Sequence, residues 1–186
     1  MDREAALKNA SELDRNTGLD RNTGLDRNME PDRNTGPDKN TGLSQNHVSC
    51  TYVTARYQET DQMGVIHHSV YPIWFEAGRT DWIKMAGMSY SDLERKGIML
   101  PLIELTCTYK SYAKYEDELV IKTCMDKISN TRISFYYEVF RTADENALIA
   151  CGKTFHVFTN AELKPVNMKK HNPGIFEKLE NMVRAQ

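Results

Sequence analysis

The sequence has few of the features that mark specialised classes of protein. No apolar run reaches the roughly 18 residues that a membrane-spanning helix needs, and the N-terminus has no apolar signal-peptide core. A zinc site would need clustered ligands, and a small secreted domain would need more cysteine. The four cysteines are instead spread widely without a C-x-x-C pair. We therefore expect a cytoplasmic protein with reduced thiols at Cys50, Cys107, Cys124 and Cys151.

The chain also lacks a strong excess of either charge, because its 186 residues carry a net charge of only −2. This balance argues against nucleic acid as the main partner. The first 46 residues contain no aromatic residue and consist largely of six-residue repeats such as LDRNTG. Their Asn, Asp and Gly favour turns, and they offer too little apolar area to offset the entropy cost of folding. We predict a disordered low-complexity leader over residues 1–46 and one folded domain over residues 47–186.

The first half of the predicted domain contains a strand and two helices. β-branched and aromatic residues favour a strand over residues 47–57. Apolar residues then recur at helical spacing over residues 69–86, with Ser69 as a candidate N-cap and Gly87 as the stop. A short second helix is expected over residues 89–96. The apolar stripe of the long helix is broad, which predicts three aromatic core residues, Trp74, Phe75 and Trp82.

After position 101 the hydrophobic period changes to two residues, which predicts four long strands. Short turns at residues 115–118, 129–130 and 143–146 predict antiparallel hairpins between them. A terminal helix is expected over residues 173–183. This order gives an α+β fold, in which an antiparallel sheet of five or so strands wraps around the long helix and its unpaired edges favour dimerisation. The core face predicted for the last strand holds Ala147, Ile149, Cys151, Phe155 and Val157.

Asp61 and His68 stand seven residues apart in the segment YQETDQMGVIHHSVYPIWFEAGRTDW, just before the long helix. A carboxylate beside a helix N-terminus has free backbone N–H groups next to it, and the positive helix end favours its ionised form. A base or nucleophile beside a group that polarises a carbonyl oxygen is the minimum equipment for acyl transfer. An Asp in a turn is more often a cap or a solvated residue, but Asp61 lies well upstream of the expected cap at Ser69.

This segment, together with the long helix and the strands after it, resembles the hotdog-fold acyl-CoA thioesterases of the 4-hydroxybenzoyl-CoA thioesterase and YbgC-like family. The resemblance covers residues 47 to about 183 and rests on the motif TDQMGVIHHSVYPIWFEAGRTDW. It implies hydrolysis of an acyl-CoA to the free acid and coenzyme A, with no metal or redox cofactor. It also implies active sites at the interface of homodimers, which often pair into homotetramers.

In the family pattern, Asp61 is the catalytic nucleophile or general base, and the backbone N–H of His68 polarises the thioester carbonyl. The His68 side chain matches the YbgC-like branch, which favours a general acyl-CoA substrate over 4-hydroxybenzoyl-CoA. Gly64 and Val65 stand in family positions that we assign to substrate binding. Tyr71, one turn beyond the reactive end, could line the acyl pocket.

Other polar residues have weaker assignments. Glu76 and Arg79 could form an ordinary helix-surface pair, whereas the resemblance suggests a role at the subunit interface. His67 is expected to pack or to lie on the surface, and His156 is assigned no role. Basic residues should gather where the phosphates of coenzyme A bind. The candidates by residue type are Lys110, Lys114, Lys127, Arg132 and Lys153.

Two other functions stay open from the sequence. The same fold could hydrolyse acyl groups carried on an acyl carrier protein, or it could bind acyl-CoA without catalysis as a sensor or scaffold. Asp61 argues against the second, because a pure binder has no evident need for an ionised carboxylate facing a thioester. A hotdog dehydratase is a weaker alternative, since the sequence lacks the usual histidine-containing hydratase signature.

Overall fold

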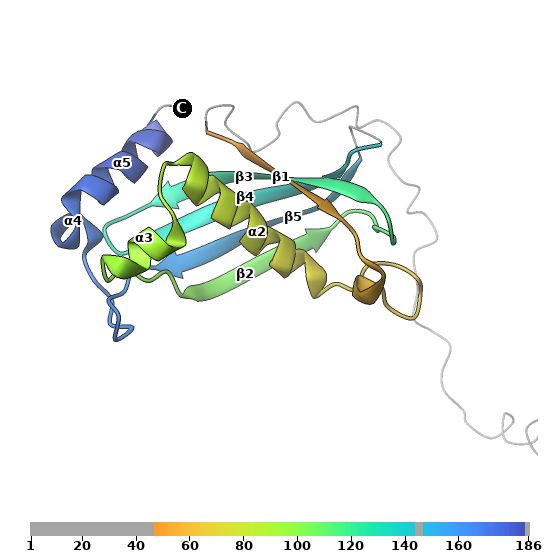
Figure 1. Cartoon of the computed structure of the whole chain (residues 1–186), viewed down its shortest axis with the longest axis horizontal. Coiled ribbons are helices and arrows are strands. Elements are labelled where there is room, and N and C mark those ends of the chain that lie inside the picture. The colour runs from red at the N-terminus through yellow and green to blue at the C-terminus, as the bar shows by residue number, and fades with distance from the viewer. Residues whose placement is uncertain (1–46, 144–146, 185–186) are drawn as a thin grey trace, which may run out of the picture. The chain divides into compact units, whose positions relative to one another are not determined.

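A computed structural model of the chain describes residues 47–143 and 147–184, and the leader predicted over residues 1–46 lies outside them. No helix of the described part is long and apolar enough to cross a bilayer. The expected helices and strands are confirmed to within a few residues. In chain order (Figure 1) they are β1 (Ser49–Thr54), the 3-10 helix η2 (Tyr57–Glu59), α2 (Val70–Met85), α3 (Tyr90–Arg95), β2 (Leu102–Tyr109), β3 (Glu118–Ile128), β4 (Arg132–Arg141), β5 (Leu148–Val157), α4 (Met168–His171) and α5 (Pro173–Arg184).

The five strands form one antiparallel sheet in the order β1-β3-β4-β5-β2. The predicted hairpins between β3 and β4 and between β4 and β5 are confirmed, although residues 144–146 of the second turn lie outside the described part. The hairpin predicted at residues 115–118 is wrong, because β2 pairs with β5 at the far edge, with Cys107 opposite Gly152. A local turn signal shows that the chain reverses, but it does not identify the partner strand.

β1 is shorter than the strand predicted over residues 47–57. Residues 57–59 turn into η2, and the buried Glu59 carboxylate accepts from the Arg56 N–H at 2.8 Å. The Arg56 guanidinium also pairs with this carboxylate at 2.7 Å. The chain therefore leaves the sheet early and turns toward the segment that precedes α2.

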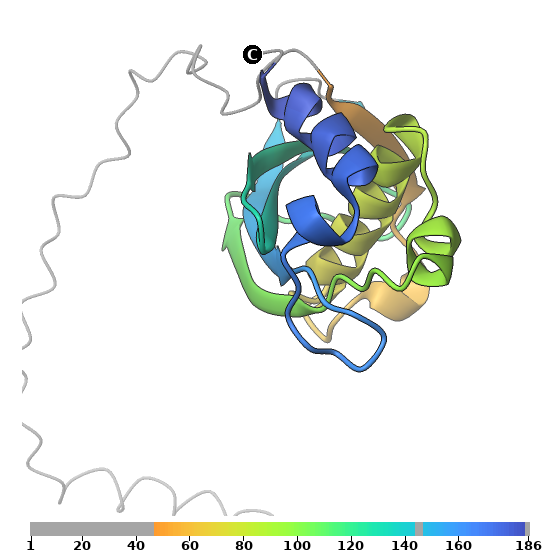
Figure 2. The same ribbon diagram turned by 90° about the vertical axis from the view of Figure 1, so that its left-hand side faces the viewer.

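α2 packs on one face of the sheet, and Figure 2 shows the sheet curving around it. Its buried residues recur at the predicted spacing and include the three predicted aromatic residues. The Phe75 ring stacks on Tyr137 of β4, with ring centroids 4.5 Å apart. Gly78 allows so close an approach to β3 that a Cβ placed there would lie 2.4 Å from Thr123 Oγ1. These contacts fix the height of α2 above the sheet, and with it the position of its N-terminus.

The core face of β5 differs from the predicted one. Of the predicted residues only Ile149 is buried, and the others are half-buried. The hydrophobic pattern predicted the wrong face, because Gly152, Thr154 and His156 occupy the side of β5 that faces α2. The Phe75 ring fills the space above Gly152. The buried residues on this side are Ala150, Gly152, Thr154 and His156.

Gly152→Ala is expected to lower the free energy of unfolding by about 1–3 kcal/mol, the usual cost of an extra carbon in a packed core. The added Cβ would lie 2.3 Å from the Thr106 carbonyl oxygen and 2.6 Å from the Phe75 ring. Chemical denaturation measures the change. Gly174→Ala is the matched control, because no atom lies within 4 Å of a Cβ placed there. Equal midpoints for the two variants would contradict the close packing.

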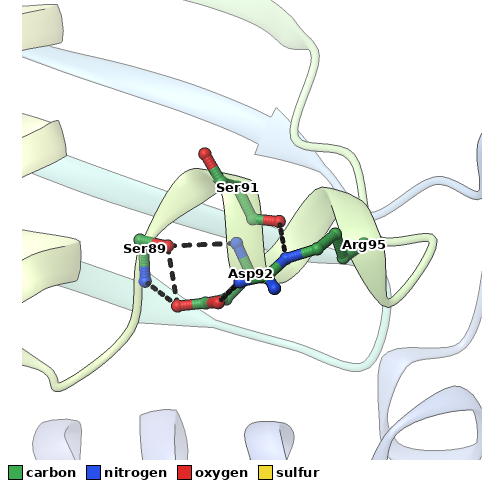
Figure 3. A network of polar contacts seen from close by, with 4 residues as sticks. All are labelled: Ser89, Ser91, Asp92 and Arg95. Carbon is green, nitrogen blue, oxygen red and sulfur yellow. Dashed lines mark hydrogen bonds and ion pairs between the residues drawn. The ribbon is translucent and has the colours of Figure 1, made fainter.

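α3 is short, and local hydrogen bonds define its start (Figure 3). The Ser89 hydroxyl accepts from the Asp92 N–H at 3.0 Å, and the Asp92 carboxylate accepts from the Ser89 N–H at 3.2 Å. Arg95 pairs with the same carboxylate and donates to the Ser91 carbonyl at 3.2 Å. This capping box satisfies backbone N–H groups that a helix end otherwise leaves free.

Candidate active site

Asp61 lies in a tight turn that its own carboxylate closes. Its Oδ1 accepts from the Met63 N–H at 2.8 Å and from the Val65 N–H at 3.4 Å, and its backbone N–H donates to the Val65 carbonyl at 2.8 Å. Gly64 has a φ of +75°, a conformation that glycine adopts without steric cost. The half-buried carboxylate is thereby held in one orientation. Its Oδ2 accepts no hydrogen bond from any residue of the described ranges.

The segment over residues 66–69 joins this turn to α2 and is anchored by three other parts of the chain. The Ile66 N–H donates to the Ala113 carbonyl at 2.8 Å, and the His67 N–H donates to the Glu59 carbonyl at 2.8 Å. From β2, the Tyr109 hydroxyl donates to the His68 carbonyl at 3.0 Å. The segment that leads into α2 is therefore fixed in place.

The backbone N–H of His68 is a free donor at the start of α2. The His67 carbonyl accepts from the Val70 N–H at 3.0 Å, and His67 Nδ1 accepts from the Ser69 N–H at 3.3 Å. Ser69 occupies the predicted N-cap position, but its hydroxyl lies 2.7 Å from His67 Nδ1 and does not cap the helix. The His68 N–H has no acceptor within the part of the chain that the structure describes. It is therefore available to the carbonyl oxygen of a ligand.

The side chains around this donor have different environments. The exposed His68 ring packs on His67, with centroids 4.0 Å apart. Tyr71 is buried, and its ring centroid lies 5.0 Å from those of both Trp74 and Tyr109. This burial raises the pKa of the Tyr71 hydroxyl. Tyr71 thus supports the start of α2 from within the core and lines none of the cavities described below.

The structure brings four of the five predicted site residues, all but Tyr71, into one anchored loop. Asp61, Gly64 and Val65 form its turn, and His68 forms its end. Neither Asp61 nor His68 lines any of the three cavities described below. The described part of the chain therefore supplies, in one loop, a half-buried carboxylate and the free N–H of the exposed His68.

Sequence reasoning missed a buried polar cluster around His156. Arg79 Nη1 lies 2.9 Å from His156 Nδ1 instead of pairing with Glu76, and the described residues place no carboxylate within ion-pair distance of Arg79. His156 Nδ1 lies 3.0 Å from the Leu100 carbonyl oxygen, and Nε2 lies 3.0 Å from Thr154 Oγ1. Burial, with a smaller contribution from Arg79, lowers the pKa of His156 to about 4. The sequence did offer one signal of this cluster: Thr154 and His156 lie two residues apart in a strand, so both point to the same face of the sheet.

Two cavities lie along α2 and share Glu76 and Arg79 in their walls. The larger, of about 420 Å³, includes Tyr90, whose hydroxyl is buried without a hydrogen-bond partner among the described residues. Burial raises the pKa of Tyr90 to about 12. The smaller, of about 190 Å³, is mainly apolar and includes Ile73, which lies little more than one helical turn from His68.

The basic residues proposed for coenzyme A phosphates do not gather in one place. Lys153 pairs with Asp126 at 3.1 Å. Lys127 and Arg132 line a third cavity, of about 260 Å³, at the turn between β3 and β4. Lys110 and Lys114 are exposed in the connection between β2 and β3. This connection also anchors the loop over residues 61–69, because the Ala113 carbonyl accepts from the Ile66 N–H.

The thioesterase-like superfamily matches residues 55–179, and the chain belongs to this superfamily. Among curated relatives, the chain is similar to the putative acyl-CoA thioesterase YneP of Bacillus subtilis, with 34% identity over 128 residues, covering 68% of this chain and 91% of that protein. It is also similar to the acyl-CoA thioesterase YbgC of Haemophilus influenzae, with 26% identity over 131 residues, covering 69% of this chain and 93% of that protein.

Solved structures give the same assignment. A DHNA-CoA thioesterase from Staphylococcus aureus has a TM-score of 0.69 and 35% identity, covering 74% of this chain and 91% of that chain. The protein TT1821 from Thermus thermophilus has a TM-score of 0.65 and 32% identity, covering 73% of this chain and 97% of that chain. A 4-hydroxybenzoyl-CoA thioesterase at 17% identity, with a TM-score of 0.62 and coverage of 72% and 98%, supports the fold alone. The predicted hotdog fold and thioesterase family are confirmed.

Proposed function

We propose that this chain hydrolyses acyl-CoA thioesters to the free acid and coenzyme A, with Asp61 and the His68 N–H as its reactive groups. One observation carries the assignment of these residues. A carboxylate held by two backbone N–H groups shares an anchored loop with a backbone donor that has no acceptor among the described residues. These are the two groups that acyl transfer needs, whereas a simple binding module has no evident need for a carboxylate facing a thioester.

Two routes through Asp61 are consistent with this geometry. In the first, a carboxylate oxygen attacks the thioester carbon, the carbonyl electrons move to the oxygen that the His68 N–H stabilises, and coenzyme A leaves as the thiolate. Water then hydrolyses the resulting anhydride and restores the carboxylate. In the second, the carboxylate takes a proton from the water that attacks the carbon. Both routes need an ionised carboxylate with one oxygen that accepts no hydrogen bond. Among the described residues, Oδ2 of Asp61 meets the second requirement.

We also propose that the protein works in the cytoplasm as a homodimer, which assembles further to a homotetramer. We call residues 61–69 the reactive loop; His68 is exposed on it, and a second copy of the chain would cover this surface. β2 is an edge strand of the described sheet and carries Leu102 and Ile103, each about half exposed. An edge of this kind favours pairing with another chain.

A thiol-release assay with a panel of short, long and aromatic acyl-CoA substrates tests the activity. We expect turnover with at least one acyl-CoA, because two relatives that match over more than nine-tenths of their length are named a putative acyl-CoA thioesterase and an acyl-CoA thioesterase. Faster release from acyl carrier protein than from every matched acyl-CoA would favour the carrier-protein alternative. Tight acyl-CoA binding without release of thiol would favour the sensor alternative.

A further inference from the structure

Exposed aromatic rings gather beside the reactive loop, in the connection between β2 and β3 and in η2. Tyr57, Tyr112 and Tyr115 are 76%, 55% and 49% exposed. The Tyr57 and Tyr115 rings meet edge to face, with centroids 5.6 Å apart. The Lys114 ammonium lies 5.4 Å from the Tyr112 ring centroid. We call these four residues the tyrosine patch. Exposed apolar side chains that occur together, and not singly, indicate a binding surface.

The tyrosine patch is held rigidly, although its side chains face solvent. Arg141 donates to the Tyr112 carbonyl at 2.8 Å and to the Asp117 carboxylate at 3.1 Å. The same carboxylate accepts from the Lys114 N–H at 2.8 Å and so closes the turn. Ala55 holds the turn from the other side, since its N–H donates to the Asp117 carbonyl at 2.9 Å. A fixed backbone lowers the entropy cost of binding to the exposed rings.

The tyrosine patch also lies close to the proposed reaction centre. Tyr109 contacts the His68 carbonyl, and Tyr112 follows it by three residues, which span at most about 11 Å. Ala113, between Tyr112 and Lys114, accepts the hydrogen bond that anchors the reactive loop. A ligand whose thioester meets the His68 N–H therefore needs only a flexible arm to reach the patch.

We propose that the tyrosine patch binds the 3′-phosphorylated adenosine diphosphate end of coenzyme A. This inference rests on the proposed function and names the carrier on which the acyl group arrives. Aromatic faces are the protein groups on which nucleobases stack, and a lysine ammonium serves a phosphate as a point charge. Three rings and one ammonium match one base and its phosphates. A protein carrier would need a surface of about 800 Å² on each partner.

Substrate preference is the first test, with acyl-CoA compared against the same acyl group on pantetheine, which lacks the nucleotide. The wild-type protein should prefer acyl-CoA through a lower KM. We expect Tyr112→Ala combined with Lys114→Gln to reduce this preference by about tenfold, within the range measured for losing one stacked base. Tyr52→Ala is the matched control, because Tyr52 is 72% exposed on β1 outside the patch. An unchanged preference in the double variant would overturn the proposal, while hydrolysis of acyl-CoA would stand.

Binding without catalysis is the second test, and it uses adenosine 3′,5′-bisphosphate with the full-length chain in titration calorimetry. We expect the double variant, but not Tyr52→Ala, to lose about tenfold in affinity, and the wild-type affinity to fall as salt rises. Thermal melting should show that both variants stay folded. If the double variant lost turnover with an acyl carrier protein but kept its affinity for the nucleotide, the patch would be a protein-docking surface and the proposal would be wrong.

Discussion

Asp61→Asn is expected to lower kcat for thiol release from an acyl-CoA by at least about a hundredfold, the lower range for removing a positioned base. The substitution removes the negative charge but keeps an oxygen that can accept the Met63 and Val65 N–H bonds. The turn should therefore persist, and the loss should be chemical. Saturating substrate in the thiol-release assay separates this effect on kcat from any change in KM.

Glu177→Gln is a suitable control for Asp61→Asn, because it removes one carboxylate charge from an exposed position on α5. It should retain wild-type turnover, and both variants should melt at the wild-type temperature. Comparable kcat values for Asp61→Asn and the wild-type protein would exclude Asp61 as nucleophile and as general base. A lowered melting temperature for Asp61→Asn would instead mean that the turn, and not the chemistry, had been tested.

The second large effect is expected from His156 on acidification. Its pKa is lowered to about 4 in the folded protein, whereas an unperturbed histidine has a pKa of about 6.5. Between these values the unfolded chain binds a proton that the folded protein does not bind, so stability falls as pH falls. The expected loss is about 3 kcal/mol of unfolding free energy between pH 6.5 and pH 4. Denaturant titrations at a series of pH values measure it.

His156→Gln provides the comparison for this pH dependence. A glutamine can still donate to the Leu100 carbonyl and accept from Thr154, but it does not titrate. The guanidinium of Arg79 stays charged throughout this range. The difference in stability between the wild-type protein and His156→Gln should therefore shrink steadily from pH 6.5 to pH 4. A difference that stays constant with pH would show that His156 does not carry the proton.

Much of the fold could be predicted because local patterns determined it. The 3.6-residue period gave α2, and the two-residue period gave the long strands. Strand pairing could not be predicted, since the partner of β2 depends on contacts with β5 that are distant in sequence. The prediction that β2 and β3 form a hairpin failed for this reason.

The candidate site was predictable to the same extent. Asp61 and His68 belong to one local motif, so their place in one loop followed from the sequence. The support from Tyr109 and Ala113 did not, because both lie beyond α2 in sequence and reach the loop only through the tertiary fold. His156 was overlooked because its strand buries Gly152 and Thr154 on the same side, which reverses the expected hydrophobic pattern.

The position of β2 has a consequence for biosynthesis. β2 joins the described sheet through β5 alone, and β5 is the last strand of that sheet to leave the ribosome. Tyr109, which supports the His68 carbonyl, sits at the end of β2. A nascent chain therefore carries Asp61 and His68 early, but Tyr109 reaches its place beside the His68 carbonyl only after β5 has been synthesised. A product truncated before residue 157 would contain the Asp61 turn but would lack a fully paired β2, and with it the support of Tyr109.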